Sequence, residues 1–311
     1  MTDAGRYNPG DLRAARRIAE RPDFFDRPLI VLSAPRSGST LLYELLTRSS
    51  AVYGLGGESH GVIEELGGFD PMDGRVRSNR LNEHDADPDT VLTLRSGFLL
   101  GARDVRGVRY LDCSPAARPA AIRFIEKTPK NMLRVPFMRA VFPGARFVLL
   151  VRDAREAMSS MIEAWESGKF ITYASLAGFR GPWSMLLPEG YQSVSGKPID
   201  ACVAFQWRES MRVVLADLNE VPRADWCAVG YRELVDDPAA VLRRIGALAE
   251  LDFADVAAQI ATGPLPLSTH TLSPPRPDKW ERHAARLRKM LPLVADVERQ
   301  AATLLAPGAP A

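Results

Sequence analysis

The chain has 311 residues, of which 46% are hydrophobic and 25% are charged. This composition is typical of a globular enzyme and excludes the disordered and fibrous classes. Forty basic and 38 acidic residues leave a formal charge of +2, so the overall charge gives no reason to expect a nucleic-acid partner. The three cysteines lie far apart in the sequence, which argues against a zinc cluster or a disulfide framework.

The first ten residues lack the apolar run of a secretory signal, and no segment approaches membrane-spanning length. We therefore expect a cytoplasmic protein without integral membrane association. Residues 1–27 are predicted to form an N-terminal arm with a short helix from Asp11 to Glu20, capped by Asp11. Residues 28–311 are predicted to form a single domain with a C-terminal helical extension. A homodimer is left open.

Apolar runs that alternate with amphipathic segments predict the fold. Leu29–Leu32 and Phe147–Val151 are continuous apolar runs, typical of parallel strands that are covered on both faces. Further elements are expected as weaker strands at 122–125 and 227–229, and as helices at 40–47, 154–165 and 202–218. This order predicts an α/β, P-loop-like fold, with a parallel β-sheet flanked by helices on both faces. The long loops 54–89 and 168–198 are expected on the substrate side.

The turn after the first strand reads Ala34-Pro35-Arg36-Ser37-Gly38-Ser39-Thr40. Free N–H groups and the positive end of the following helix favour a bound phosphate there. Gly38 allows a close approach of the backbone, and Arg36 adds charge-assisted donors. A Walker A loop would have glycine at position 33 and lysine at position 39, but this chain has serine at both. The pattern therefore disfavours a P-loop kinase or nucleotide hydrolase.

A second polar pair follows the second strong strand. Arg152 and Ser160 lie eight residues apart, across the end of that strand and the helix after it. Ligands of open α/β sheets bind outside the carboxyl ends of the strands. The two turns are thus placed to hold the two ends of one bisphosphorylated nucleotide.

Together these motifs resemble the sulfotransferase superfamily. The resemblance rests on Pro-Arg-Ser-Gly-Ser-Thr-Leu-Leu after a strand, and on Phe-Pro-Gly-Ala-Arg-Phe-Val-Leu-Leu-Val-Arg-Asp with a serine eight residues after its last arginine. Further matches lie at 126–131, 231–238 and 277–280. The likeness spans about residues 28 to 282 and is greatest to the bacterial and tyrosylprotein-type branch.

The resemblance implies 3′-phosphoadenosine 5′-phosphosulfate as the sulfuryl donor and 3′,5′-bisphosphoadenosine as its product. Its 5′-phosphosulfate would be held by Arg36, Ser37, Gly38, Ser39 and Thr40. Arg152 and Ser160 would hold the 3′-phosphate, and Trp280 would cover the adenine. The remaining donor contacts that the resemblance implies are Tyr231, Ser273 and Lys279.

An acceptor hydroxyl, or less favourably an amine, loses a proton as it attacks sulfur, so a general base is needed. The resemblance places Glu58 where tyrosylprotein-type enzymes supply a carboxylate base. His60 is the alternative base. Fixed cations stabilise the charge that rises on the sulfuryl oxygens, a role that suits Arg36 and Lys127. Lys130 is expected to be a surface or supporting charge.

The acceptor is expected to be a small molecule, a lipid or a glycoside. Its pocket is predicted to take apolar, aromatic surface from Trp165, Tyr173, Phe179 and Trp183. No metal constellation occurs in the sequence, and no metal is expected. A non-catalytic nucleotide-binding protein remains the second alternative, beside the kinase or hydrolase. The basic residues 282, 286, 288 and 289 are expected to form a solvated helix face.

Overall fold

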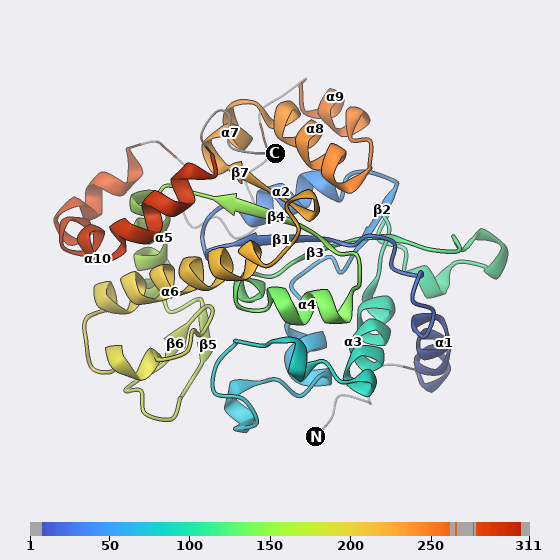
Figure 1. Ribbon diagram of the computed structural model, residues 1–311, viewed down its shortest axis with the longest axis horizontal. Helices are drawn as coiled ribbons and strands as arrows, with labels where there is room; N and C mark the ends of the chain where they lie inside the picture. Colours follow the sequence, from blue (N-terminus) through green and yellow to red (C-terminus); the bar gives the residue numbers. More distant parts are fainter. Residues whose placement is uncertain (1–7, 262–264, 266–275, 277, 306–311) are drawn as a thin grey trace.

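A five-stranded parallel sheet forms the centre of the molecule (Figure 1). This computed structural model describes residues 8–261, 265, 276 and 278–305. Its strands are β1 (Leu29–Ser33), β2 (Val52–Gly54), β3 (Arg123–Lys127), β4 (Arg146–Val151) and β7 (Trp226–Gly230). They run in the order β2-β3-β1-β4-β7, and each neighbouring pair is parallel. The carboxyl ends of β1 and β4 are therefore adjacent at one edge of the sheet.

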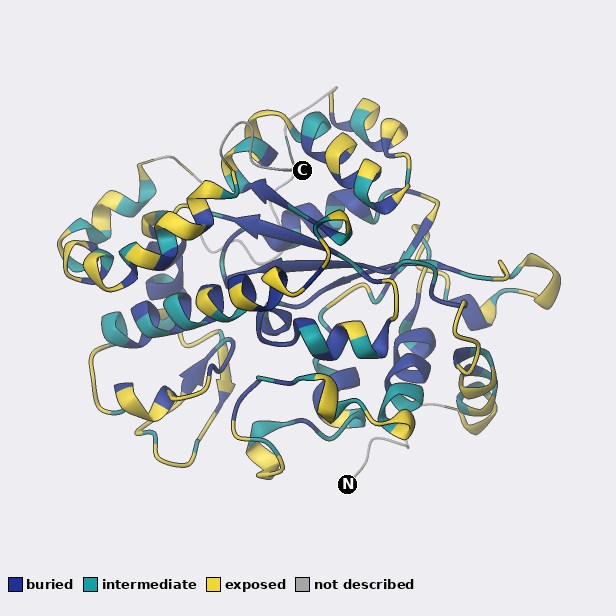
Figure 2. Cartoon of the chain, in the orientation of Figure 1, coloured by how far each residue is buried: buried dark blue, intermediate teal, exposed yellow. Residues whose placement is uncertain are grey.

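Helices cover both faces of the sheet, so the predicted α/β fold is confirmed. Alternate residues of β1 enter two separate cores, with Ile30 and Leu32 in one and Leu29 and Val31 in the other. Figure 2 shows the buried strands between layers whose outer sides are exposed. The larger core packs under α1 (Pro9–Ala19), α3 (Pro88–Gly101), α4 (Val135–Val141), α5 (Ala154–Ser167), α6 (Ile199–Asn219) and α10 (Ala284–Thr303). The smaller core packs under α2 (Ser39–Leu46), α7 (Tyr231–Asp236), α8 (Pro238–Ala249) and α9 (Ala254–Ile260).

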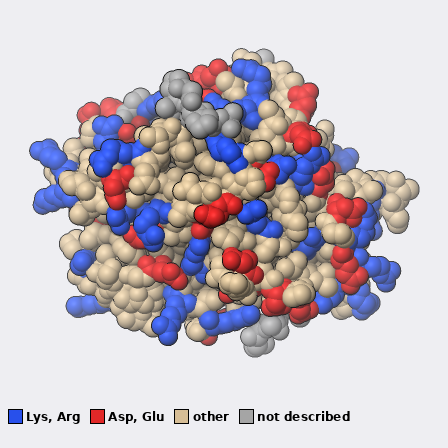
Figure 3. Space-filling model, in the orientation of Figure 1, with Lys and Arg blue, Asp and Glu red and all other residues tan. Residues whose placement is uncertain are grey.

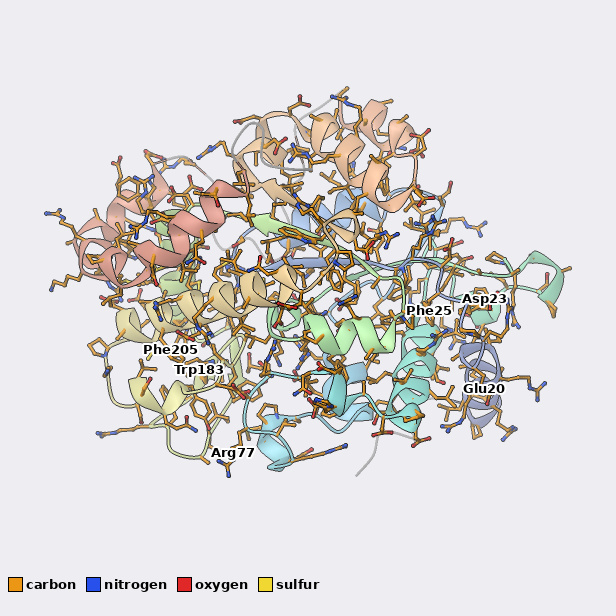
Figure 4. All side chains as sticks on the ribbon, in the orientation of Figure 1. Glu20, Asp23, Phe25, Arg77, Trp183 and Phe205 are labelled. Atoms are coloured by element: carbon orange, nitrogen blue, oxygen red, sulfur yellow. The ribbon has the colours of Figure 1, made fainter. Side chains whose placement is uncertain are left out.

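The N-terminal segment is packed against the domain rather than extended from it. Helix α1 begins two residues earlier than predicted, and its cap is Asn8, whose side chain accepts from Gly10 N at 2.8 Å. Asp11 lies in the first turn, so the prediction that it caps the helix was wrong. Phe24 and Phe25 are buried in the larger core, and Figure 4 labels Phe25 between α1 and the sheet. The division of the chain at residue 28 stays a prediction.

The two long loops contain short elements of their own. A π-helical turn, Gly61–Leu66, lies in the first loop, and such turns often occur at functional sites. The second loop carries an antiparallel hairpin of β5 (Ile171–Tyr173) and β6 (Trp183–Ser184). Neither element has a regular apolar repeat long enough to be recognised in the sequence.

Charge is spread over the visible surface. Figure 3 shows basic and acidic side chains interspersed on this face. Within the part of the chain that the structure describes, no helix combines the length and apolarity needed to cross a membrane. The cytoplasmic location and the homodimer stay predictions.

Candidate active site at the carboxyl ends of the strands

The turn between β1 and α2 reverses direction within a few residues. Arg36 has φ 65° and Gly38 has φ 93°, both in the left-handed region. A Cβ on Gly38 would lie 2.5 Å from the ring of Tyr231, so glycine is needed there for space as well as for conformation. Ser37 and Ser39 are buried, whereas Arg36 and Thr40 are partly exposed. The turn thus presents a guanidinium and a hydroxyl beside the N-terminus of α2.

Arg152 and Ser160 meet this turn, as the sequence predicts. The Arg152 Nη1 donates to the backbone oxygen of Arg36 at 2.9 Å, and Arg36 Nε lies 3.4 Å from Ser160 Oγ. The Arg152 guanidinium also stacks on Tyr231, 4.3 Å from the ring centroid. Glu156, one helical turn after Arg152, accepts from its Nε at 3.0 Å. The two predicted phosphate sites are therefore one connected structure.

A small pocket opens beside Arg152. It is lined by Arg152, Glu156, Ser159, Ser160, Arg276, Lys279 and Trp280. Burial lowers the pKa of Lys279, and the charges of Arg152, Arg36 and Arg276 lower it further. The pKa of Arg36 is likewise lowered by burial and then by Arg152. An anion bound among these cations would reduce their mutual repulsion.

Lys127, Glu58 and His60 form a second cluster next to the turn. Lys127 Nζ donates to Glu58 Oε1 at 2.7 Å and lies 3.4 Å from Thr40 Oγ1. His60 Nε2 lies 2.8 Å from the other oxygen of Glu58. Lys127 reaches this place because it ends β3, which pairs with β1. The predicted base, the alternative base and the predicted cation are thus in direct contact.

Glu58 is ionised at neutral pH. Burial alone would raise its pKa, but the hydrogen bond from His60 and the charge and hydrogen bond of Lys127 outweigh burial and lower the pKa to about 2. Because a carboxylate only accepts, His60 Nε2 carries the proton of the bond between them. The buried His60 Nδ1 has no hydrogen-bond partner among the described residues and lies 4.0 Å from Glu64 Oε1. At neutral pH the Glu58 carboxylate is able to accept a proton, while His60 Nε2 already carries one.

Two roles were expected for Lys130, a surface charge or a supporting charge, and the surface position was wrong because Lys130 is buried. Its Nζ donates to both oxygens of Glu64, at 2.7 and 2.6 Å, and Arg134 Nη2 donates to Glu64 at 2.8 Å. Of the basic residues on and before α10, Arg288 and Lys289 are exposed as expected. Arg286 instead pairs with Asp200 and with Glu166.

The four predicted acceptor-pocket aromatics pack mainly on one another. The Trp183 ring lies 5.1 Å from Trp165 and 5.0 Å from Phe179, and Trp183 and Tyr173 are fully buried. Figure 4 shows Trp183 near Phe205, below α6. Only Trp165 and Phe179 keep side-chain surface to offer a ligand.

Sequence reasoning missed two residues at the site. Phe170 covers the guanidinium of Arg36, 4.7 Å from the ring centroid, and no local pattern connects residues so far apart. Glu156 could have been found, because it stands four residues after Arg152 on a predicted helix. Ser273, a predicted donor contact, lies outside the described residues. The described residues hold no group of three or more metal-ligating side chains.

Comparison with known proteins identifies the family. The model of the sulfotransferase family matches residues 28–255, which is more than half of the chain. The chain belongs to the sulfotransferase family. Protein-tyrosine sulfotransferase A of Caenorhabditis elegans is 22% identical over 229 residues, 73% of this chain and 50% of that protein. The chain spans 42% and 50% of the length of the two curated relatives that it matches.

Solved structures of sulfotransferases share the fold. Sulfotransferase STF1 from Mycobacterium tuberculosis is 16% identical, with a TM-score of 0.50 over 92% of this chain and 81% of that one. At this identity the likeness concerns the α/β architecture alone.

Proposed function

We propose that this sulfotransferase transfers the sulfuryl group of 3′-phosphoadenosine 5′-phosphosulfate to a hydroxyl, less favourably an amine, of a small-molecule, lipid or glycoside acceptor. One observation carries the proposal. The cationic turn after β1 and the cationic pocket after β4 are joined by the bond from Arg152 to Arg36, and the Lys127–Glu58 pair lies next to them. Two anion sites beside an ionised carboxylate suit a donor with a charged group at each end.

The described residues fit such a donor. The pKa values of Arg36 and Lys279 are lowered by burial and by neighbouring cations, so a ligand with several negative charges would relieve that repulsion. Ser160, Lys279 and Trp280 line the pocket intended for the 3′-phosphate and the adenine. When bound, the donor supplies the sulfuryl group and leaves as 3′,5′-bisphosphoadenosine. The proposal assigns no role to a metal ion.

The residues of the chain supply the acid–base and electrostatic parts of the reaction. Glu58, already ionised, accepts the proton of the acceptor hydroxyl. Protonation removes the charge that Lys127 neutralises, and the ammonium is left to stabilise negative charge that develops beside it. Arg36, held by Ser160 and covered by Phe170, supplies a second fixed cation. Both cations are set in place before the reaction begins, which lowers the cost of reorganisation.

Ligand-dependent thermal stability tests the donor assignment. A ligand that binds only the folded state at 100 times its Kd stabilises that state by about 2.7 kcal/mol. We expect 3′,5′-bisphosphoadenosine to raise the Tm, and ATP with Mg²⁺ to raise it much less. Stabilisation by ATP with Mg²⁺ alone would contradict the proposal and favour a kinase or hydrolase. Transfer of radiolabelled sulfate from the donor to extracts of the source organism would then identify the acceptor.

A further inference from the structure

The residue between Glu58 and His60 is tied to the end of β3. Ser59 is fully buried, and its backbone N–H donates to Thr128 Oγ1 at 2.8 Å. The Ser59 hydroxyl lies 3.0 Å from the same oxygen. Thr128, also fully buried, thus holds both the backbone and the side chain of Ser59.

Glu126 fixes the direction of the Thr128 hydroxyl. Thr128 Oγ1 donates to Glu126 Oε1 at 2.6 Å, and Asn131 Nδ2 donates to the other oxygen of Glu126. With its proton in the bond to Glu126, Thr128 Oγ1 accepts the N–H of Ser59 through a lone pair. A buried chain of this kind is stiff, since each broken bond leaves a polar group unpaired at a cost of about 1–3 kcal/mol.

Neighbouring residues at the end of β3 serve two different partners. Lys127 donates to Glu58, while Thr128, the next residue, holds Ser59. Successive side chains of an extended segment point in opposite directions. The pairs Lys127–Glu58 and Thr128–Ser59 attach the loop after β2 to the end of β3 at two consecutive residues.

On the other side of Glu58, the backbone N–H of Gly56 donates to the hydroxyl of the buried Tyr43 at 3.1 Å, two residues before Glu58. Gly56 and Gly57 precede it and are exposed, and a Cβ built on either would meet nothing within 4 Å. Gly56 also has φ 72°, which favours glycine. The backbone of Glu58 is therefore held by Tyr43 from two residues before it and by Thr128 directly after it, at Ser59.

We propose that Thr128 is a positioning residue, which acts through Ser59 to hold Glu58 at the place where it meets Lys127 and the acceptor. Glu126 supports this role by orienting the Thr128 hydroxyl. Neither residue touches the reacting groups. The inference rests on the proposed function of Glu58 as general base, and its test must separate the two.

Two substitutions of Thr128 distinguish positioning from packing. Thr128→Val keeps the shape but removes the hydroxyl, whereas Thr128→Ser keeps the hydroxyl and removes a methyl group. A displacement of about 1 Å at a reacting group can cost about 100-fold in rate, so we expect Thr128→Val to lower kcat about 10- to 100-fold. The KM for the donor and the Tm increase with 3′,5′-bisphosphoadenosine should change less than about twofold. Thr128→Ser should recover most of kcat.

Thr47→Val is the matched control, because it removes a threonine hydroxyl that bonds Tyr43 O at 2.8 Å, at the C-terminal end of α2. It should leave kcat unchanged. Rates are normalised to the bisphosphoadenosine-binding fraction, so loss of folded protein does not count as loss of catalysis. If Thr128→Val does not fold, Thr128→Ala is compared with Thr128→Ser, because these two variants differ only in the hydroxyl. Wild-type kcat for a folded Thr128→Val or Thr128→Ala enzyme would overturn the inference.

A double-mutant cycle with Glu58→Gln separates the two proposals. If Thr128 acts through Glu58, Thr128→Val should reduce the residual rate of Glu58→Gln by less than about threefold. A full 10- to 100-fold loss in that background would show that Thr128 acts elsewhere and would overturn the inference while Glu58 stays the base. Full activity of Glu58→Gln alone would instead contradict the proposed base, and the inference would fail with it.

Discussion

Lys127 Nζ lies 2.7 Å from Glu58 Oε1, so the cation and the carboxylate of the candidate site form one ion pair. The Lys127 side chain is only 4% exposed, against 26% for Glu58. Removing either partner would leave the other charge poorly solvated. The properties of the two residues must therefore be tested as those of a pair.

Glu58→Gln should abolish most turnover and preserve donor binding. The amide keeps the size of the side chain but cannot accept a proton, and loss of a general base costs roughly 10²- to 10⁴-fold in rate. Sulfate transfer measured at saturating donor gives kcat, and titration with 3′,5′-bisphosphoadenosine gives Kd, which should change little. Glu65→Gln, in the same loop but exposed, is the control and should keep wild-type kcat.

The pH dependence of kcat/KM should show no acid limb from Glu58 above about pH 3. Because its folded-state pKa is lowered to about 2, Glu58 is ionised throughout the range in which most proteins stay folded. A histidine base of ordinary pKa would give a limb near pH 6.5. Such a limb, if it persisted in Glu58→Gln and vanished in His60→Gln, would reassign the base to His60.

The same pKa shift makes a prediction about acid stability. A lowered carboxyl pKa stabilises the folded state at pH values above the unfolded-state pKa of about 4.3, and that stability is lost as the pH falls toward about 2. Denaturant titrations at pH 7, 5 and 3.5 should therefore show a smaller loss of unfolding free energy for Glu58→Gln than for the wild type. An equal loss in both proteins would contradict the shift.

Arg152→Ala should weaken donor binding more than it lowers the rate at saturation. A hydrogen bond to a charged group is worth about 1.5–3 kcal/mol, which corresponds to a roughly 10- to 150-fold rise in Kd for 3′,5′-bisphosphoadenosine. Arg152→Lys should recover part of the affinity, because lysine keeps the charge but not the planar fork. Calorimetry measures both, with the exposed Arg139→Ala as control. Unchanged affinity in Arg152→Ala would remove this residue from the donor site.

Gly38→Ala should lower the free energy of unfolding more than Gly107→Ala, although both glycines have a positive φ. Gly107 has φ 78° with open space around its missing Cβ, so Gly107→Ala tests conformation alone, at about 1–2 kcal/mol. Gly38→Ala adds a clash with Tyr231. We expect a larger drop in unfolding free energy and weaker bisphosphoadenosine binding for Gly38→Ala only. Equal effects of the two variants would show that the close packing on Tyr231 is unimportant.

The parallel sheet and the two turns at the candidate site could be predicted because their signals are local. Apolar runs set β1 and β4, and the turn at 34–40 follows β1 directly. The rule that ligands bind where strands end predicted that the two turns share one ligand, but the direct contact of Arg36 with Ser160, 124 residues apart, was not predicted.

The burial of charged residues could not be predicted in the same way. Lys130 looks like a surface lysine in the sequence, but it is buried together with Glu64 and Arg134, which form an ion-pair cluster with it. Glu64 lies 66 residues before Lys130 and Arg134 lies four residues after it, so only the fold brings Glu64 to this place. The aromatic residues of the second long loop suggested a pocket wall, whereas Tyr173 and Trp183 are core residues. The sequence shows that aromatic side chains are present, but only the packing shows whether they face the core or a ligand pocket.

Gly38, Tyr231 and Arg152 belong to a closed ring of contacts. Gly38 packs on Tyr231, and Tyr231 stacks under Arg152. Arg152 in turn donates to the carbonyl of Arg36, two residues before Gly38. An anion that orders the turn after β1 therefore also orders the Arg152 guanidinium after β4. The conformational entropy of the turn and of Arg152 is therefore lost in one binding event rather than in two. A nucleotide with a charged group at each end should therefore bind more tightly than expected from its two halves. Its binding free energy should exceed the sum of those of two half-ligands, each with one charged group.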